Sequence, residues 1–193
     1  DTDWGVNSTY TGIQIASMSY GSLGGGPLLP GDSGDNGTNA DANLVNQATS
    51  AGIICVVAIG NDGSNRVPSP GSADTAITIG SVDDNQTVTR TDDVMSDFSN
   101  YGPRNSDNDD DDVDEQKPDV TAFGSNIMSA TYAASFVPIP GSEVALADDQ
   151  YDSKSGTSMA TPIASGVVAL VLEADPSLTP EEVKEIIRLS SEP

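Results

Sequence analysis

The sequence has 193 residues, of which 36% are apolar, so it can fill the core of one domain of ordinary size. Its formal net charge of −23 would repel nucleic-acid backbones and anionic membranes, and neither is an expected partner. The sequence shows neither an apolar run near the length of a membrane span nor the pattern of a signal peptide at its start.

The acidic composition can be interpreted in two ways. A hydrated surface is the simpler explanation. Adaptation to molar salt is the more specific one, because such salt shortens the Debye length to about 3 Å and suppresses self-repulsion. The sequence contains only three lysines and many aspartates, as haloarchaeal proteins do, and we therefore expect salt adaptation.

The first third of the sequence predicts a β-α-β unit. Residues 12–21 and 52–60 are short apolar runs bounded by glycine, as in strands that are buried on both faces of a parallel sheet. Between them, residues 39–52 place apolar side chains at helical intervals and end on Gly52, a typical helix stop. The only cysteine, Cys55, lies in the second run, and we interpret it as a core residue that says nothing about the compartment.

The middle of the sequence predicts further strands at residues 75–82, 117–124 and 126–132. Residues 158–175 carry apolar side chains almost all round, which predicts a helix buried in the body of the protein, with Pro162 in its first turn. The alternation of strands and helices indicates an α/β fold of three layers, in which a mainly parallel sheet carries helices on both faces.

A second C-terminal helix is predicted from Thr179, which would cap it, with Pro180 at the first helical position and Glu182 completing a capping box. Its expected apolar face consists of Val183, Ile186, Ile187 and Leu189.

Three loop segments are also predicted. Residues 21–37 and 60–72 are glycine-rich surface loops, and residues 105–115 form an acidic run. We interpret the acidic run as a solvated loop. Its carboxylates could also hold a calcium ion, but their spacing lacks the glycine and the final glutamate of an EF-hand loop.

Three segments are expected to meet beyond the carboxyl ends of the parallel strands, where α/β sheets bind ligands. They are residues 17–21 (SMSYG), residues 58–63 (AIGNDG) and residues 155–160 (SGTSMA), a turn at a helix start. The extended motif SGTSMATP resembles the nucleophile motif of the subtilisin-type serine proteases, the subtilases. AIGNDG is similar to their oxyanion-asparagine motif, and SMSYG to the strand that borders their substrate cleft. The resemblance includes DFSNYGP, KPDVTAFG and ADPSLTPEEVKEII and covers nearly all of residues 11–190.

This resemblance implies a subtilisin-like fold and a set of site residues. Ser158 would be the nucleophile that attacks a peptide carbonyl, and the Asn61 amide with the Ser158 backbone N–H would donate to the developing oxyanion. The pocket for the side chain before the scissile bond would have two walls, one of Ser19, Tyr20 and Gly21 and the other of Ala58, Ile59 and Gly60. An extended substrate could pair with the first wall as an added strand.

Simpler interpretations exist for single residues. Ser158 alone would be a helix cap, Asn61 a turn residue and Tyr20 an aromatic residue at the edge of a cleft. The order of Asn61 and Ser158 within their motifs favours the functional interpretation of both.

The sequence lacks the base that a serine nucleophile needs, because it contains no histidine. In subtilases the aspartate and histidine motifs precede the segment that matches residues 11–20. We therefore expect residues 1–193 to be a partial catalytic domain, incomplete at the N-terminus, truncated at the C-terminal end and inactive alone. Lys154 could replace the base only if burial lowered its pKa, which a turn of glycine and serine does not suggest.

The expected protein is a secreted endopeptidase that acts on polypeptides, with the missing N-terminal segment or a propeptide as a further partner. Its chemistry needs no cofactor and its site holds no metal, although a structural calcium ion is compatible with the composition. One alternative is a catalytically dead subtilase domain that binds. Another is a serine-carboxyl peptidase, which shares the fold and uses glutamate and aspartate with serine, but that group has an aspartate where this sequence has Asn61 and differs after GTS.

Overall fold

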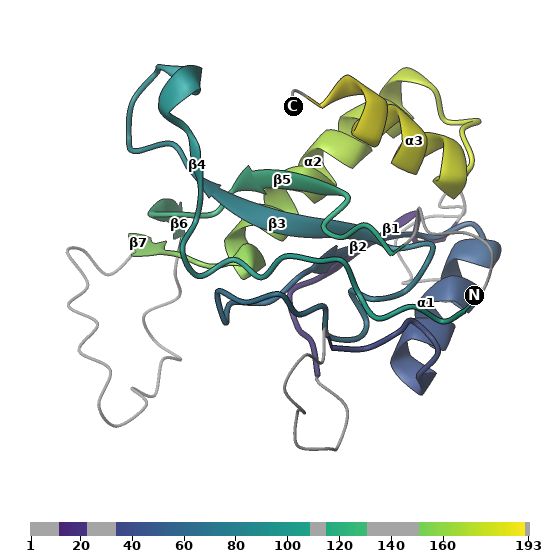
Figure 1. Ribbon diagram of the computed structural model, residues 1–193. Coiled ribbons are helices and arrows are strands. Elements are labelled where there is room, and N and C mark those ends of the chain that lie inside the picture. Colours follow the sequence, from purple (N-terminus) through teal and green to yellow (C-terminus); the bar gives the residue numbers. More distant parts are fainter. Residues whose placement is uncertain (1–11, 23–33, 109–114, 131–150, 192–193) are drawn as a thin grey trace.

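The structure is a computed structural model that describes residues 12–22, 34–108, 115–130 and 151–191 (Figure 1). In chain order its elements are β1 (Ile15–Met18), α1 (Ala40–Ser50), β2 (Ile54–Ala58), β3 (Ile77–Asp83), the 3₁₀ helix η1 (Arg90–Asp92), β4 (Val94–Met95), β5 (Val120–Phe123), β6 (Ile127–Ala130), β7 (Tyr151–Lys154), α2 (Thr157–Ala174) and α3 (Pro180–Ser190).

The main sheet has five strands and is mostly parallel. β1, β2, β3 and β5 lie side by side in parallel, and β4 joins β3 in the antiparallel direction. β6 and β7 form a separate antiparallel pair. The strands predicted from the apolar runs are confirmed with shorter bounds. The prediction missed β4 and β7, whose short sequences VM and YDSK carry little strand pattern.

β2 shows why the fold has three layers. All five of its residues are buried, and their side chains alternate between the two faces of the sheet. Ile54 and Val56 belong to the core cluster that α2 and α3 complete, whereas Cys55 and Val57 pack with residues of α1. Figure 1 shows α1 on one face of the sheet and the two C-terminal helices on the other. The predicted fold class and the buried position of Cys55 are both confirmed.

α2 differs from the prediction of a helix buried on all sides. Its face toward the sheet, which includes Ala164 and Val168, is buried. On another face Ile163, Val167 and Leu170 are 39%, 47% and 65% exposed, because no described element packs over them. By length and composition alone α2 would also be able to cross a membrane, which the sequence analysis did not foresee, but its packing against the strands accounts for its apolar character.

α3 begins as predicted. The Thr179 side chain accepts a hydrogen bond from the backbone of Glu182, whose carboxylate accepts from the Thr179 backbone, so the capping box is confirmed. Its inward face is narrower than expected: Val183 and Ile187 are buried, whereas Ile186 is 39% and Leu189 77% exposed.

A buried ionic cluster ties α3 to the start of β5. The Asp119 carboxylate lies 3.0 Å from Lys117 and 3.3 Å from Lys184, and it accepts a hydrogen bond from the backbone of Thr78. Burial alone would raise the pKa of Asp119, but the two lysines and this N–H outweigh burial and hold it below its ordinary value. Burial lowers the pKa of Lys117 to about 8.

The predicted acidic loop lies partly outside the described residues, since 109–114 are not among them. Within the described ranges, no group of three or more His, Cys, Asp and Glu side chains could hold a metal ion. The predicted strand at 126–132 is described only as far as Ala130.

Candidate active site

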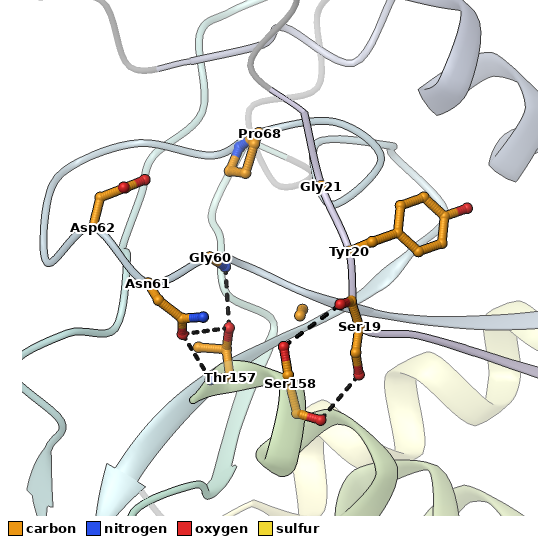
Figure 2. Close-up of a pocket in the computed structure, with 10 residues that line it drawn as sticks. Ser19, Tyr20, Gly21, Gly60, Asn61, Asp62, Pro68, Thr157 and Ser158 are labelled. Atoms are coloured by element: carbon orange, nitrogen blue, oxygen red, sulfur yellow. Dashed lines mark hydrogen bonds between the residues drawn. The ribbon is translucent and has the colours of Figure 1, made fainter. Parts of the chain in front are cut away.

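A cavity of about 350 Å³ lies where the three predicted segments meet (Figure 2). Its lining consists of Ser19, Tyr20, Gly21, Ala58, Gly60, Asn61, Asp62, Pro68, Thr157 and Ser158. The segment after β1, the segment after β2 and the first turn of α2 therefore converge, as expected for the carboxyl ends of parallel strands.

The side chain of Asn61 is held by the start of α2. Its oxygen accepts hydrogen bonds from the Thr157 backbone N–H, at 2.8 Å, and from the Thr157 hydroxyl, at 2.9 Å. A backbone N–H can only donate, so the atom that it meets must be the amide oxygen, and the orientation of the amide is fixed. The Asn61 nitrogen is left without a partner among the described residues and faces the side of the cavity where Ser158 lies (Figure 2).

Hydrogen bonds with the fully buried side chain of Asn100 hold the loop that carries Asn61. Its oxygen accepts from the backbone of Asp62 at 2.8 Å, and its nitrogen donates to the carbonyl of Ile59 at 3.3 Å. Gly60 makes this close approach feasible: its φ is +108°, and a Cβ there would lie 2.6 Å from the Asn100 nitrogen. The loop is therefore positioned by buried hydrogen bonds.

Ser158 lies in the first turn of α2, half-buried and facing Ser19 (Figure 2). Its backbone N–H has no acceptor among the described residues, as is usual for the first N–H groups of a helix. In the described part of the chain, that N–H and the Asn61 nitrogen are thus two donors without acceptors on the side of α2 where Ser158 lies. Both are near the positive end of the helix dipole, which favours negative charge there.

Pro162 lies in the second turn of α2 and not in the first, because the helix begins at Thr157. Proline has no N–H, so the Ser158 carbonyl lacks its normal partner four residues along the helix. The Ser19 hydroxyl donates to this carbonyl instead, at 3.0 Å. Ser19 and the nucleophile turn are thereby linked.

The hydroxyl of Ser158 has no base within reach among the described residues. It donates weakly to the Ser19 backbone carbonyl at 3.5 Å, and a carbonyl does not take up a proton at neutral pH. Asp62 is the one carboxylate among the described lining residues, and it already faces Arg66 at 3.6 Å and Asn100 at 3.3 Å. Lys154 lies on β7 near Asp152 and outside the cavity lining.

The two expected pocket walls are only partly present. Ala58 and Gly60 line the cavity, but Ile59 does not, because its side chain is fully buried and its backbone N–H donates to Ile79 in the sheet. The alternation of strand residues thus carries Ile59 into the core. On the opposite wall, Tyr20 is 61% exposed.

Two residues that position the site were missed by the sequence analysis. Thr157 belongs to the serine motif and Asn100 to the motif DFSNYGP, but the motifs predict no individual role for either residue. Their partners lie 96 and 38 residues away in the sequence. Neither residue shows a local pattern that predicts such a contact.

Comparison with known proteins gives consistent matches. A model of the subtilase family, peptidase S8, matches residues 5–192. The serine protease AprX of Bacillus subtilis (strain 168) is 41% identical over 146 residues, which are 75% of this chain and 31% of that protein. The halolysin-like extracellular serine protease Nep of Natrialba magadii is 32% identical over 134 residues, which are 69% of this chain and 18% of that protein.

Among solved structures, a cold adapted subtilisin-like serine proteinase matches with a TM-score of 0.56 and 29% identity. The match covers 78% of this chain and 44% of that one. The chain therefore spans less than half the length of each of these three proteins.

Proposed function

Because the chain belongs to the subtilase family of serine proteases, we propose that its cavity is the nucleophile and oxyanion site of an endopeptidase, acting through an acyl-enzyme on Ser158. The observation that carries this proposal is the fixed Asn61 amide. Thr157 holds its oxygen, so its nitrogen is available beside Ser158 without any rearrangement.

The proposed reaction has two halves. In the first, the Ser158 oxygen attacks the peptide carbonyl carbon and its proton passes to a base. The carbonyl oxygen becomes negative and accepts hydrogen bonds from the Asn61 nitrogen and the Ser158 N–H. The intermediate then collapses to an ester on Ser158, and the amine leaves with a proton. In the second half, water attacks the ester by the same route and releases the acid.

We propose that the base comes from a polypeptide segment outside these 193 residues, either from a longer form of the protein or as a separate partner. This would make the 193 residues a partial catalytic domain that is inactive alone. Two observations support it. The sequence contains no histidine. Beside the site, β1 pairs only with β2 among the described strands, so its other edge is open to a further strand. The exposed side chains of Ile163 and Val167 on α2 form an apolar surface against which such a segment could pack. The 2.9 Å hydrogen bond between Ser17 and Ser165 joins these two surfaces.

The cavity also suggests how substrate is held. Ala58 and Gly60 leave room for an apolar side chain of medium size before the scissile bond. An extended polypeptide would pair with residues 19–21 as an added strand. No cofactor has a step in this reaction.

We also propose that the protein acts outside the cell in molar salt. The net charge of −23 supports salt adaptation, and the name of the Natrialba magadii relative describes an extracellular protease. If the acidic surface is adapted to salt, the midpoint of thermal unfolding should rise continuously from 0.1 M to molar salt, because screening removes self-repulsion. A flat response in calorimetry would contradict salt adaptation and leave the catalytic proposal intact.

The decisive experiment compares the 193-residue chain with the proposed longer protein, in which the segment that carries the base is joined to this chain. We expect the longer protein to cleave casein and to be labelled at Ser158 by a fluorophosphonate, whereas the 193-residue chain does neither above background. Labelling of the short chain would mean that it holds its own base. A longer protein that is folded but neither labelled nor active would favour a binding domain without catalysis.

A further inference from the structure

A second cavity, of about 390 Å³, lies near the first and shares no lining residue with it. It is formed by the end of β3, by β4 and the residues that follow, and by the turns before β6 and α2. The lining consists of Asp83, Asn85, Val94, Met95, Ser96, Asp97, Phe98, Ser125, Asn126 and Ser155.

This second cavity borders the two segments that carry the candidate active site. The carbonyl of Phe98 accepts from the backbone of Gly63, in the loop of Asn61, at 2.8 Å. The hydroxyl of Ser155, three residues before Ser158, accepts from the backbone of Asn126 at 2.8 Å. A polypeptide that places its scissile bond at Ser158 and continues away from the first cavity would therefore reach the second one.

The lining combines apolar side chains with two carboxylates. Val94 and Met95 are 53% and 39% exposed, and Phe98 is half-buried. The hydroxyls of Ser96 and Ser125 bond to each other at 3.0 Å and are not free to bind a ligand. The polar groups available to a ligand are thus mainly the carboxylates.

Neither carboxylate of the second cavity is neutralised by a described residue. Within the described ranges, Asp83 accepts a hydrogen bond from the backbone N–H of Asn85 alone, and the Asp97 side chain has no hydrogen bond. The ion pairs of the described residues involve other acids, such as Asp62, Asp74 and Asp119. Two negative charges next to exposed apolar side chains suit a group that has an aliphatic stem and a cationic head.

We propose that the second cavity binds an arginine or lysine side chain of the polypeptide substrate, on a residue beyond the scissile bond. The proposal rests on the proposed function for the direction of the chain. The stem would pack on Val94, Met95 and Phe98, and the head would meet Asp83 and Asp97. A glutamate would be repelled, and an uncharged side chain would desolvate the carboxylates without compensation.

The test is a binding measurement that needs no turnover. Two fluorescent peptides share an apolar residue for the first cavity and differ at the second residue after it, which is either arginine or citrulline, its uncharged isostere. With the 193-residue chain carrying Ser158→Ala, at about 0.1 M salt, we expect the arginine peptide to bind about three- to tenfold more tightly, as exposed charge pairs allow. Fluorescence anisotropy gives both dissociation constants.

Variants of the two aspartates test whether the preference for the arginine peptide depends on the second cavity. Asp83→Asn and Asp97→Asn should each reduce the ratio of the two dissociation constants, and the double variant should bring it to about one. Asp84→Asn is the matched control. It removes the same charge one residue away, and Asp84 makes the same kind of hydrogen bond, to the backbone of Gln86, but lies outside the lining. Unchanged unfolding midpoints would confirm that each variant is folded.

A ratio of one in the parent chain would overturn the proposal. So would a ratio that falls equally with Asp84→Asn, since it would then report the overall charge. Failure of the proposed function shows elsewhere: a longer protein that cleaves neither peptide refutes catalysis, while the binding ratio still decides the second cavity.

Discussion

The two sides of Ser158 are organised to very different degrees. On the side of Asn61, two buried residues, Thr157 and Asn100, fix the amide and its loop through hydrogen bonds of 2.8 and 2.9 Å. On the side of the hydroxyl, the hydrogen bond found among the described residues is a long one, to the Ser19 carbonyl at 3.5 Å. The difference teaches that hydrogen bonds between distant segments can fix the orientation of donor groups at a site even where the described residues provide no proton acceptor for its hydroxyl.

The largest effect is expected from removing the nucleophile. In the longer protein, Ser158→Ala should lower kcat by roughly 10⁶-fold, the magnitude that holds for subtilisin. In the 193-residue chain the same change should have no effect on hydrolysis if, as proposed, the base lies on a segment outside this chain. Peptide hydrolysis measured on both proteins tests this, and a measurable loss in the short chain would show that its hydroxyl is activated.

The next effect should come from Asn61. In subtilisin, losing the oxyanion-hole asparagine lowers kcat by about 10²- to 10³-fold. If Asn61 has the proposed role, we expect Asn61→Ala to do the same with little change in KM. Asn61→Asp keeps an oxygen for the Thr157 bonds but removes the donor and adds a negative charge, so it should be at least as damaging. Steady-state kinetics of the longer protein decides, and an unchanged kcat in either variant would remove Asn61 from the oxyanion site.

Thr157 should have a smaller effect, because its hydroxyl acts through Asn61. Thr157→Val keeps the backbone bond to Asn61 but loses two hydroxyl bonds, the one that it donates to Asn61 and the one that it accepts from the Gly60 N–H, so kcat should fall up to about tenfold. Thr161→Val is the matched control: Thr161 is also buried in α2, but its hydroxyl bonds the Thr157 carbonyl, at 2.8 Å. We expect it to change stability and not kcat. Equal losses of kcat in both variants would indicate a general loosening of the helix.

The smallest effect should come from Ser19, whose hydroxyl replaces the bond that Pro162 cannot make. Ser19→Ala should lower kcat about two- to threefold, because water can reach this exposed carbonyl and take over the bond. Ser17→Ala is the control, since Ser17 bonds α2 about two turns further on, at Ser165. If Ser17→Ala lowered kcat as much as Ser19→Ala, the link between Ser19 and the nucleophile turn would have no specific role.

The sequence predicted what depends on local pattern. β2 could be predicted because a strand buried on both faces must be apolar throughout. The start of α3 could be predicted because its capping box is formed by residues close together in the sequence, Thr179 and Glu182. The exposure of α2 could not be predicted, since an apolar helix surface does not say whether a neighbour covers it. The burial of Ile59 and the roles of Thr157 and Asn100 depend on contacts between distant segments, which periodicity does not encode.

The apolar stripe of α2, which consists of Ile163, Val167 and Leu170 and is covered by no described element, has a consequence for the behaviour of the protein in solution. At low ionic strength the negative charge of the thirty acidic residues makes copies of the chain repel one another, so the apolar stripes of two molecules rarely come into contact. In molar salt this repulsion acts over only about 3 Å, while salting-out ions strengthen apolar contacts. If the proposed salt adaptation holds, the salt that stabilises each molecule should also promote association through Ile163, Val167 and Leu170, so that colloidal stability falls as thermal stability rises.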